Sequence, residues 1–245
     1  MSRNIKEFTF DTDSIFESLH LFPEEISGNK FMLYHGTSSC FEKRIENEGL
    51  KWSKDIFTKE QVIEVTNIFE TIQWTQNPSK PRGRGYWILS GFTLKDDFGD
   101  NKIKPIYFAE TSYRATLYAS KEYAGGETIR GLRQAFEDLN YYLSIQDISK
   151  TNRSFVQEKL NYHKELINKV NALYNNHNYG VVYAINFENK GKELLKYLGS
   201  AGMITNGVES DVIVAKVKIP NDFKYKNLGN EIGYSKNSYW REILG

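Results

Sequence analysis

The sequence predicts an α+β protein in which a block of helices interrupts a strand-rich domain. Short apolar runs typical of strands occur early, at residues 31–34, and late, at 181–187 and 212–219. Between them, from about residue 127 to residue 178, apolar residues recur only at helical spacing. Because the early and late strands must share a sheet, we expect residues 1–245 to form one domain with a helical insertion at about 127–178.

Helices are expected on both sides of the first strand. A short helix starts near Ser14 and ends before Pro23, which cannot continue it. After the strand, we expect a helix over 40–48 with Ser39 as its cap. Gly49 stands where the end of a helix favours a positive φ.

The middle of the chain alternates between helix, loop and strand. Apolar spacing over 59–74 predicts an amphipathic helix. The basic stretch 77–85, rich in Pro and Gly, is typical of a loop, and residues 86–94 after it are expected to form a strand. A short strand at 106–108 and a helix over 112–123 follow.

The insertion contains one narrow apolar stripe whose members lie four and three residues apart, as in helices that pack together. Its members are Val156, Leu160, His163, Ile167, Val170 and Tyr174. The stripe either covers the core of the insertion or forms a docking face for a partner. We expect His163 to be a packed histidine rather than a ligand.

The composition is that of an ordinary folded protein, with 40% hydrophobic residues, 26% charged residues and a net charge of +1. This charge excludes steering onto nucleic acid by the field of the whole molecule, although a local basic patch stays open. Cys40 is the only cysteine, so no internal disulfide can form and a reducing compartment fits. The sequence has no signal-peptide pattern and no stretch near the roughly 18–20 apolar residues of a membrane span, so we expect a cytoplasmic protein without a membrane partner.

Two segments carry residue types suited to holding a flat ligand. In residues 33–37 a predicted strand runs into His35 and Gly36, and the glycine would let a backbone come close to a ligand. Tyr107 ends a later strand and Tyr118 follows in a helix, so the two rings could clamp a flat ring. Taken alone, each segment also fits an ordinary core.

A third segment enters the last predicted strand with two carboxylates, Glu209 and Asp211. Residues two apart in an extended chain point the same way, so both would face one site. An acidic turn before a strand would explain this segment equally well when taken alone. The order of the three segments along the chain is what favours a shared site.

Together the three segments resemble the NAD-dependent ADP-ribosyltransferases. His35-Gly36-Thr37 before a helix, Ile-Tyr107-Phe-Ala with a second tyrosine eleven residues later, and an acid entering a late strand follow the order of that family. The likeness is to its His-Tyr-Glu branch, which includes the poly(ADP-ribose) polymerases and diphtheria toxin. It covers about a fifth of the chain, and the Tyr107 segment is its most specific part.

The resemblance implies a fold and a set of roles. The fold would be a split antiparallel β-sandwich with flanking helices, carrying the helical insertion. His35 would hydrogen-bond the ribose of NAD next to nicotinamide, and Gly36, followed by Thr37, would offer its backbone N–H and C=O to the carboxamide. Tyr118 would stack on the nicotinamide ring, and Tyr107 would pack on its other side.

The chemistry of the reaction suits these residues. Breaking the bond between ribose and nicotinamide passes through an oxocarbenium-like state, which a nearby carboxylate stabilises. Aromatic stacking holds the pyridinium ring, partly as a cation–π contact. The leaving nicotinamide is neutral, and neither a metal nor a cysteine is required.

Two residues compete for the role of the catalytic acid. Asp211 aligns with the glutamate of the family but is one methylene shorter, whereas Glu209 lies two residues upstream on the same expected face. In some branches that upstream position selects the acceptor, which is another role for Glu209. Glu231, in a late Gly-Asn-Glu-Ile-Gly stretch, is a third candidate.

A second departure from the family concerns the helix after Tyr107. The residue that commonly hydrogen-bonds the carboxamide from this helix is Ala115 here. Thr116 or Ser112 would have to take that role, while the backbone of Gly36 remains available.

The sequence leaves the acceptor undecided between protein and nucleic acid. Lys80, Arg82 and Arg84 in the basic loop could contact the pyrophosphate of NAD or a nucleic-acid backbone, or could simply be solvated. The layout resembles that of bacterial ADP-ribosylating toxins. It implies a toxin of a toxin–antitoxin or anti-phage system, with an antitoxin protein as partner.

Three other functions stay open at this point. An RNA 2′-phosphotransferase would want a second histidine in place of Tyr107, so the tyrosine argues against it. An NAD glycohydrolase would pass ADP-ribose to water. A catalytically inactive NAD-binding or interaction module is favoured by the aspartate at the glutamate position.

Overall fold

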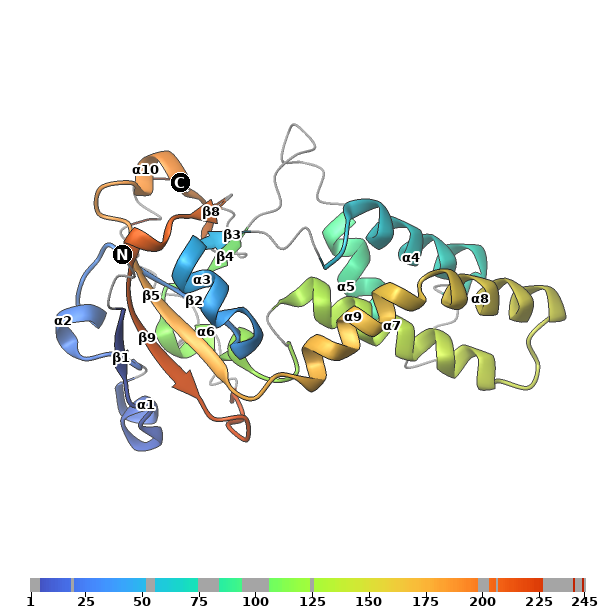
Figure 1. The fold of residues 1–245 in the computed structure, drawn as a ribbon, viewed down its shortest axis with the longest axis horizontal. Coiled ribbons are helices and arrows are strands. Elements are labelled where there is room, and N and C mark those ends of the chain that lie inside the picture. Colours follow the sequence, from blue (N-terminus) through green and yellow to red (C-terminus); the bar gives the residue numbers. More distant parts are fainter. Residues whose placement is uncertain are drawn as a thin grey trace. The chain divides into compact units, whose positions relative to one another are not determined.

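The chain divides into two compact units (Figure 1). Unit 1 comprises Met1–Trp52, Ile103–Gly125 and His177–Gly245, and unit 2 comprises Ser53–Lys102 and Gly126–Asn176. The mixture of helices and strands confirms the predicted α+β class. The computed structural model describes residues 5–18, 20–51, 56–74, 84–93, 106–123, 126–197, 203–205, 207–226, 240 and 244.

Unit 1 is built on a four-stranded mixed sheet with the strand order β1-β9-β5-β2. β1 (Lys6–Phe8) is parallel to β9 (Ile213–Ile219). β5 (Gly180–Asn186) runs antiparallel to both β9 and β2 (Met32–Ser38), and Figure 1 shows β5 beside β9. The early strand and the two late strands predicted from the sequence are therefore confirmed, and they share one sheet.

Two smaller sheets complete the strands of unit 1. β4 (Ile106–Phe108), which confirms another prediction, forms an antiparallel sheet with β7 (Met203–Thr205) and β6 (Lys196–Tyr197) in the order β4-β7-β6. β3 (Leu50–Lys51) pairs with β8 (Gly207–Val208).

Short helices connect these strands. Their bounds are α1 (Thr12–Ser18), α2 (Glu24–Ser27), η1 (Ser39–Phe41), α3 (Glu42–Glu48), α6 (Ser112–Ala119), α10 (Gly191–Leu194) and η5 (Ser210–Val212). The helix predicted at 40–48 is thus a 3-10 turn followed by α3. Its cap is not Ser39 but Ser38, whose hydroxyl accepts the N–H of Cys40. Gly49 ends α3 with a φ of 81°, as predicted.

Apolar side chains cover both faces of the four-stranded sheet. Because successive side chains of a strand point to opposite faces, neighbours in β2 enter different cores. Tyr34 belongs to the core beneath α6, with Ala115 and Ala119 of that helix. Leu33 belongs to the opposite core, which includes Phe108 of β4.

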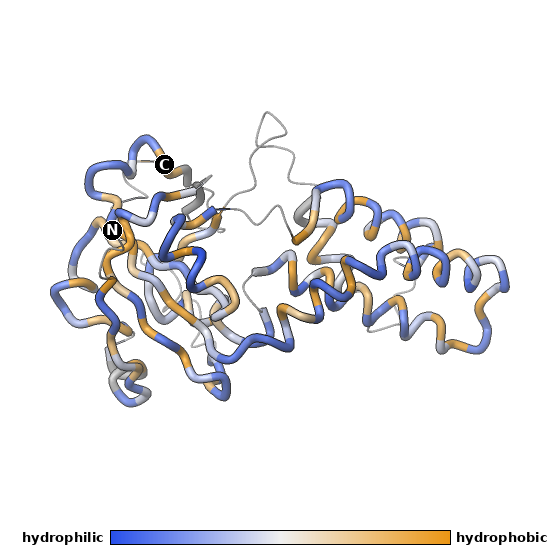
Figure 2. Tube along the Cα trace, viewed as in Figure 1, coloured by the Kyte–Doolittle hydropathy of each residue, from blue (hydrophilic) through white to orange (hydrophobic). Residues whose placement is uncertain are grey.

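Unit 2 contains helices whose hydrophobic and hydrophilic residues alternate along the chain (Figure 2). Its helices are α4 (Lys59–Thr71), α5 (Arg84–Thr93), α7 (Glu127–Ser144), α8 (Lys150–Tyr162) and α9 (Lys164–Asn175). The predicted helix at 59–74 and the predicted helical block are both confirmed as helical. In the described parts of both units, no helix combines the length and the apolar character needed to cross a membrane.

The strand predicted at 86–94 is wrong, because this segment forms α5. Leu89 is fully buried while Trp87 is 68% exposed, as on opposite sides of an amphipathic helix. A Cβ added at Gly131 of α7 would lie 2.8 Å from the side chain of Leu89, so the two helices approach closely. Packing against α7, which is distant in sequence, overrides the strand propensity of the Tyr-Trp-Ile-Leu run.

The apolar stripe predicted over 156–174 follows two helices rather than one. His163 separates α8 from α9, and Leu166 rather than Ile167 is buried in α9, because the break shifts the helical phase. As predicted, His163 is packed: it is 3% exposed, and its Nε2 lies 3.7 Å from a carboxylate oxygen of Glu64. Burial lowers its pKa below the ordinary value.

Candidate functional site

One edge of β2 pairs with β5, and the opposite, outer edge pairs, in the described part of the chain, with residue 109 only near its start. Tyr34 N donates to Ala109 O at 2.9 Å, and Ala109 N donates to Tyr34 O at 2.8 Å. Alternate residues of a strand direct their N–H and C=O groups to the same edge, so Gly36 presents both of its groups there. Within the described residues, the pair of Tyr34 and Ala109 is the only pairing along this edge. Gly36 therefore offers one donor and one acceptor side by side.

The two sheets separate at Gly36. Continuing the antiparallel pair of Tyr34 and Ala109 by two residues would set Tyr107 opposite Gly36. Instead, β2 and β4 belong to different sheets of the described structure. The donor and acceptor of Gly36 thus lie where β4 leaves β2.

Gly36 is also required by the packing of α6. A Cβ at Gly36 would lie 1.8 Å from Ala115 O and 2.9 Å from Ala119 N. A Cβ at Gly180, on the neighbouring strand, would lie 2.1 Å from Ala119 O. The two glycines let the helix backbone lie directly on the sheet. Gly36, which was predicted to let a ligand approach the backbone, therefore also lets α6 pack against the sheet.

His35 is held by the strand that carries Tyr107. Its Nδ1 lies 3.0 Å from Tyr107 O. A carbonyl only accepts hydrogen bonds, so Nδ1 carries a proton and donates it. Burial lowers the pKa of His35 although the bond to Tyr107 opposes the shift, so the ring is neutral at pH 7. The neutral ring then has its lone pair on Nε2, ready to accept a hydrogen bond.

Tyr107 and Tyr118 come from two elements that lie beside the middle of β2. Tyr107 is half-buried on β4 and contacts His35 through its carbonyl. Tyr118 is half-buried on α6, directly before Ala119, and its ring meets that of Tyr123 edge-on with centroids 5.2 Å apart. The structure thus brings the elements that carry His35, Gly36 and the two tyrosines together beside the middle of β2.

Thr37, Ser112 and Thr116 are buried, and the hydroxyls of the last two make hydrogen bonds within the protein. Thr37 is 2% exposed, and the side chains of Ser112 and Thr116 are fully buried. The hydroxyl of Ser112 accepts the N–H of Leu21 at 2.8 Å, and that of Thr116 donates to Tyr113 O at 2.7 Å. Both hydroxyls of α6 are therefore engaged in hydrogen bonds within the protein.

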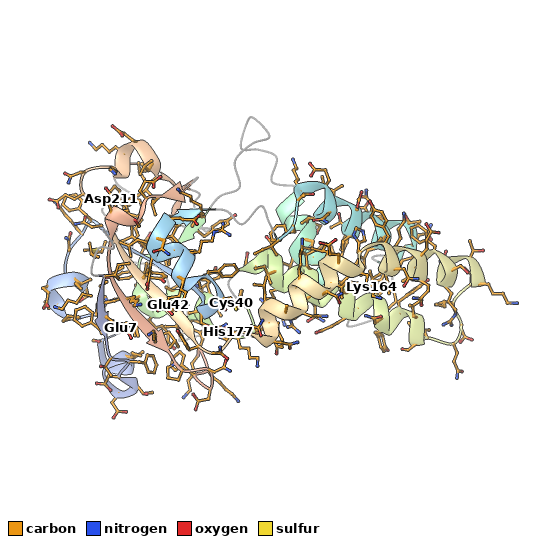
Figure 3. The ribbon with its side chains drawn as sticks, in the orientation of Figure 1. Glu7, Cys40, Glu42, Lys164, His177 and Asp211 are labelled. Carbon is orange, nitrogen blue, oxygen red and sulfur yellow. The ribbon has the colours of Figure 1, made fainter. Side chains whose placement is uncertain are left out.

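The expectation that Glu209 and Asp211 share one face is wrong. They do not lie in an extended strand, because residues 210–212 form the turn η5. Glu209 Oε2 lies 3.6 Å from Lys51 Nζ, whereas Asp211 Oδ2 lies 3.2 Å from Lys190 Nζ. Both acids are exposed, and Figure 3 shows Asp211 near α10, apart from Glu42. The turn directs the two carboxylates to different lysines.

The strand beside Tyr107 is β7 rather than the strand that follows the acids. Tyr107 is in register with Ile204 of β7. Glu209 and Asp211 come later, after β8, which pairs with β3. The described structure therefore does not bring either acid next to Tyr107. Glu231 lies outside the described residues, as do Lys80 and Arg82 of the basic loop.

A partly buried cluster of charges, which the sequence reasoning missed, lies on the α3 side of the sheet. Lys216 of β9 is 8% exposed, and its Nζ lies 2.6 Å from Glu42 Oε1 and 3.3 Å from Glu7 Oε2, with Glu46 as a third partner. Lys218 Nζ lies 3.0 Å from Glu7 Oε1. Two lysines at alternate positions of an otherwise apolar strand were the signal for this cluster.

The cluster keeps the carboxylate of Glu42 charged. Burial alone would raise the pKa of Glu42, but hydrogen bonds from Lys216 and from the hydroxyl of Tyr179, at 2.6 Å, outweigh burial and lower it. Burial alone would lower the pKa of Lys216, but its hydrogen bonds to Glu42 and Glu46 outweigh burial and raise it. Every charged group of the cluster thus has a charged partner, which is typical of a structural ion cluster.

A second buried histidine lies at the end of β2. His177 is 2% exposed, and its Nδ1 lies 2.9 Å from Ser38 Oγ. Its Nε2 is buried without a hydrogen-bond partner among the described residues. Burial, together with the charge of Lys121, lowers the pKa of His177. His177 is therefore neutral at pH 7 and packs against the C-terminal end of β2.

Comparison with known proteins returned no match: no family model matches the sequence, and the searches of the curated proteins and of the solved structures found no match. The described residues also contain no group of three or more His, Cys, Asp or Glu side chains arranged to hold a metal ion. The candidate site therefore rests on the geometry around His35 and Gly36 of β2 and on the resemblance of its motifs.

Proposed function

We propose that this protein binds NAD and transfers its ADP-ribose to a macromolecular acceptor. The observation that carries the proposal is the backbone N–H and C=O of Gly36, presented where β2 and β4 separate. A carboxamide offers one acceptor and one donor in the complementary arrangement. His35, Tyr107 and Tyr118 flank this position in the order that the resemblance to ADP-ribosyltransferases implies.

The sheet arrangement supports the same proposal. A four-stranded sheet and a separate antiparallel sheet of three strands, with α6 covering one face of the larger sheet, agree with a split β-sandwich. The larger sheet is mixed rather than wholly antiparallel as expected, because β1 runs parallel to β9. The Tyr107 strand lies at an outer position of the smaller sheet and the His35 strand at an outer position of the larger one. In this proposal the insertion corresponds to α7, α8 and α9 of unit 2.

The binding step follows from the chemistry of these residues. Nε2 of neutral His35 would accept a hydrogen bond from a ribose hydroxyl, while its Nδ1 stays bound to Tyr107 O. The ring of Tyr118 would stack on the pyridinium ring of NAD, with Tyr107 on the other side. The developing oxocarbenium charge calls for a carboxylate, so Glu209 or Asp211 would have to exchange its lysine for the substrate.

A second function, an NAD-binding module without turnover, is favoured by the position of the acids. Both are exposed and paired with lysines, and the strand beside Tyr107 precedes them. Such a module would bind NAD through Gly36 and Tyr118 but would release no nicotinamide. An NAD glycohydrolase remains the alternative in which water is the acceptor.

The test is incubation of the purified protein with NAD labelled in its ADP-ribose portion, together with separate pools of cellular protein, RNA and DNA. Label that enters one pool and disappears with His35→Ala would support the transferase and identify the acceptor class. Free ADP-ribose without a labelled macromolecule would favour the glycohydrolase. NAD that binds but is not consumed would favour the inactive module, and absence of binding would overturn the proposal.

The proposed biological setting is a bacterial toxin of a toxin–antitoxin or anti-phage system that acts in the cytoplasm and is neutralised by an antitoxin protein. Expression of the wild-type chain in bacteria would then arrest growth, whereas expression of His35→Ala would not. Equal growth with both chains would argue against this setting.

A further inference from the structure

A short segment after β9, residues 223–226, lies against α6 and is called the strap here. The hydroxyl of Tyr113 donates to Lys226 O at 2.8 Å and accepts the N–H of Lys226 at 3.2 Å. Burial raises the pKa of Tyr113, so its hydroxyl keeps the proton that it donates. The rings of Tyr113 and Tyr225 lie 5.1 Å apart.

Two further contacts hold the strap. Arg114 of α6 donates from Nη1 to the hydroxyl of Tyr225 at 3.1 Å. At the other end, the ring of Phe223 meets that of Phe10 edge-on, with centroids 5.1 Å apart. The strap is therefore tied to α6 by side chains of both partners and to the N-terminal segment by an aromatic pair.

The strap and the sheet hold α6 on different sides. Ala115 and Ala119 contact the sheet at Gly36 and Gly180. Tyr113 and Arg114, which point away from that line of alanines by the helical spacing, contact the strap. A helix of eight residues is too short to be stable by itself, so these outside contacts determine where it lies.

We propose that the strap is a positioning clamp, which holds α6 against Gly36 and thereby sets the place of the Tyr118 ring. This inference rests on the proposed function, because Tyr118 would act by stacking on nicotinamide. Tyr113 and Tyr225 are then positioning residues that do not touch the substrate. Loosening the clamp weakens the binding of NAD while leaving the chemical step at saturation unchanged.

The experiment compares Tyr113→Phe with the wild type in NAD turnover and in amide hydrogen exchange of α6. The variant keeps the ring and removes both hydrogen bonds to Lys226. We expect faster exchange of the α6 amides and a KM for NAD roughly five- to tenfold higher, the scale of one or two neutral hydrogen bonds, with kcat within about twofold. Tyr225→Phe, which removes the bond from Arg114, should shift both readouts in the same direction by less.

Tyr142→Phe is the matched control. Tyr142 of unit 2 is also buried, and its hydroxyl accepts a hydrogen bond from Asn152 Nδ2 at 3.3 Å. This control should change neither the exchange of α6 nor the KM. An unchanged KM in Tyr113→Phe, or an equal rise in Tyr142→Phe, would overturn the clamp. Failure of the wild type to bind NAD would instead overturn the proposed function, and with it the role of the clamp in NAD binding.

Discussion

The polar groups at the outer edge of β2 and those of the charged cluster on β9 differ in whether they have partners. At Gly36, a backbone donor and acceptor stand where the pairing of the described strands has ended, and His35 beside them has one ring nitrogen bound and one left to accept. On β9, Lys216 has three carboxylate partners, and Glu42 bonds both a lysine and a tyrosine. Satisfied charges point to structure, whereas polar groups left at an interrupted edge point to a ligand.

The strongest test of this contrast is Lys216→Met. It should lower the free energy of unfolding by about 3 kcal/mol, because Glu42, whose side chain is 11% exposed, loses its nearest cation and keeps only Lys218 at 3.7 Å. The control is Lys190→Met, since Lys190 and Asp211 form a pair whose side chains are 41% and 48% exposed. Loss of such an exposed pair costs about 0–1 kcal/mol. Denaturant unfolding measures both, and similar losses would remove the distinction between the cluster and a surface pair.

Gly36→Ala tests the other side of the comparison. The added Cβ would collide with the backbone of α6, so we expect a loss of about 1–3 kcal/mol in the free energy of unfolding and loss of NAD binding. Gly126→Ala is the matched control, because a Cβ there meets nothing within 4 Å among the described residues. Denaturant unfolding and NAD titration measure the two effects. Wild-type stability and binding in Gly36→Ala would show that α6 does not lie as described.

The buried histidines predict a pH dependence. The pKa of His177 is lowered in the folded state, so below pH about 6.5 the unfolded chain takes up a proton that the folded chain does not. This contribution to the free energy of unfolding is present in full above that pH and is lost on acidification. Between pH 7 and pH 5, the free energy of unfolding should therefore fall less in His177→Gln than in the wild type, as measured by denaturant unfolding at each pH. His35 acts with the same sign, so part of the dependence should remain in the variant.

The smallest effects are expected for the exposed acids. Glu209→Gln and Asp211→Asn should each change the free energy of unfolding by less than about 1 kcal/mol, because each removes one exposed ion pair. Their effects on NAD turnover should differ, since an acid that stabilises the transition state lowers kcat by orders of magnitude with little change in binding. Full turnover in both variants would place the catalytic carboxylate elsewhere in the chain.

Residues in regular strands were the most predictable from the sequence. His35 and Gly36 were expected at the end of a strand but lie inside β2, which continues to Ser38. The alternation of that strand still fixes which edge and which face each residue presents, and β4 follows the same rule for Tyr107. The segment at 209–211 was mispredicted because two-residue alternation holds only in extended chain, and a single 3-10 turn cancels it. The segment at 86–94 was mispredicted because burial against α7 outweighs local propensity.

The sequence by itself determined the α+β class, the helical character of the block at 127–175, and the strands that carry His35 and Tyr107. These follow from local periodicity, which a single chain segment contains in full. Only the tertiary structure decided that Gly36 faces α6 with its Cα while its backbone groups point along an interrupted edge. It also decided that Glu209 and Asp211 pair with different lysines and that Lys216 pairs with three glutamates, because such pairings depend on segments far apart in the chain.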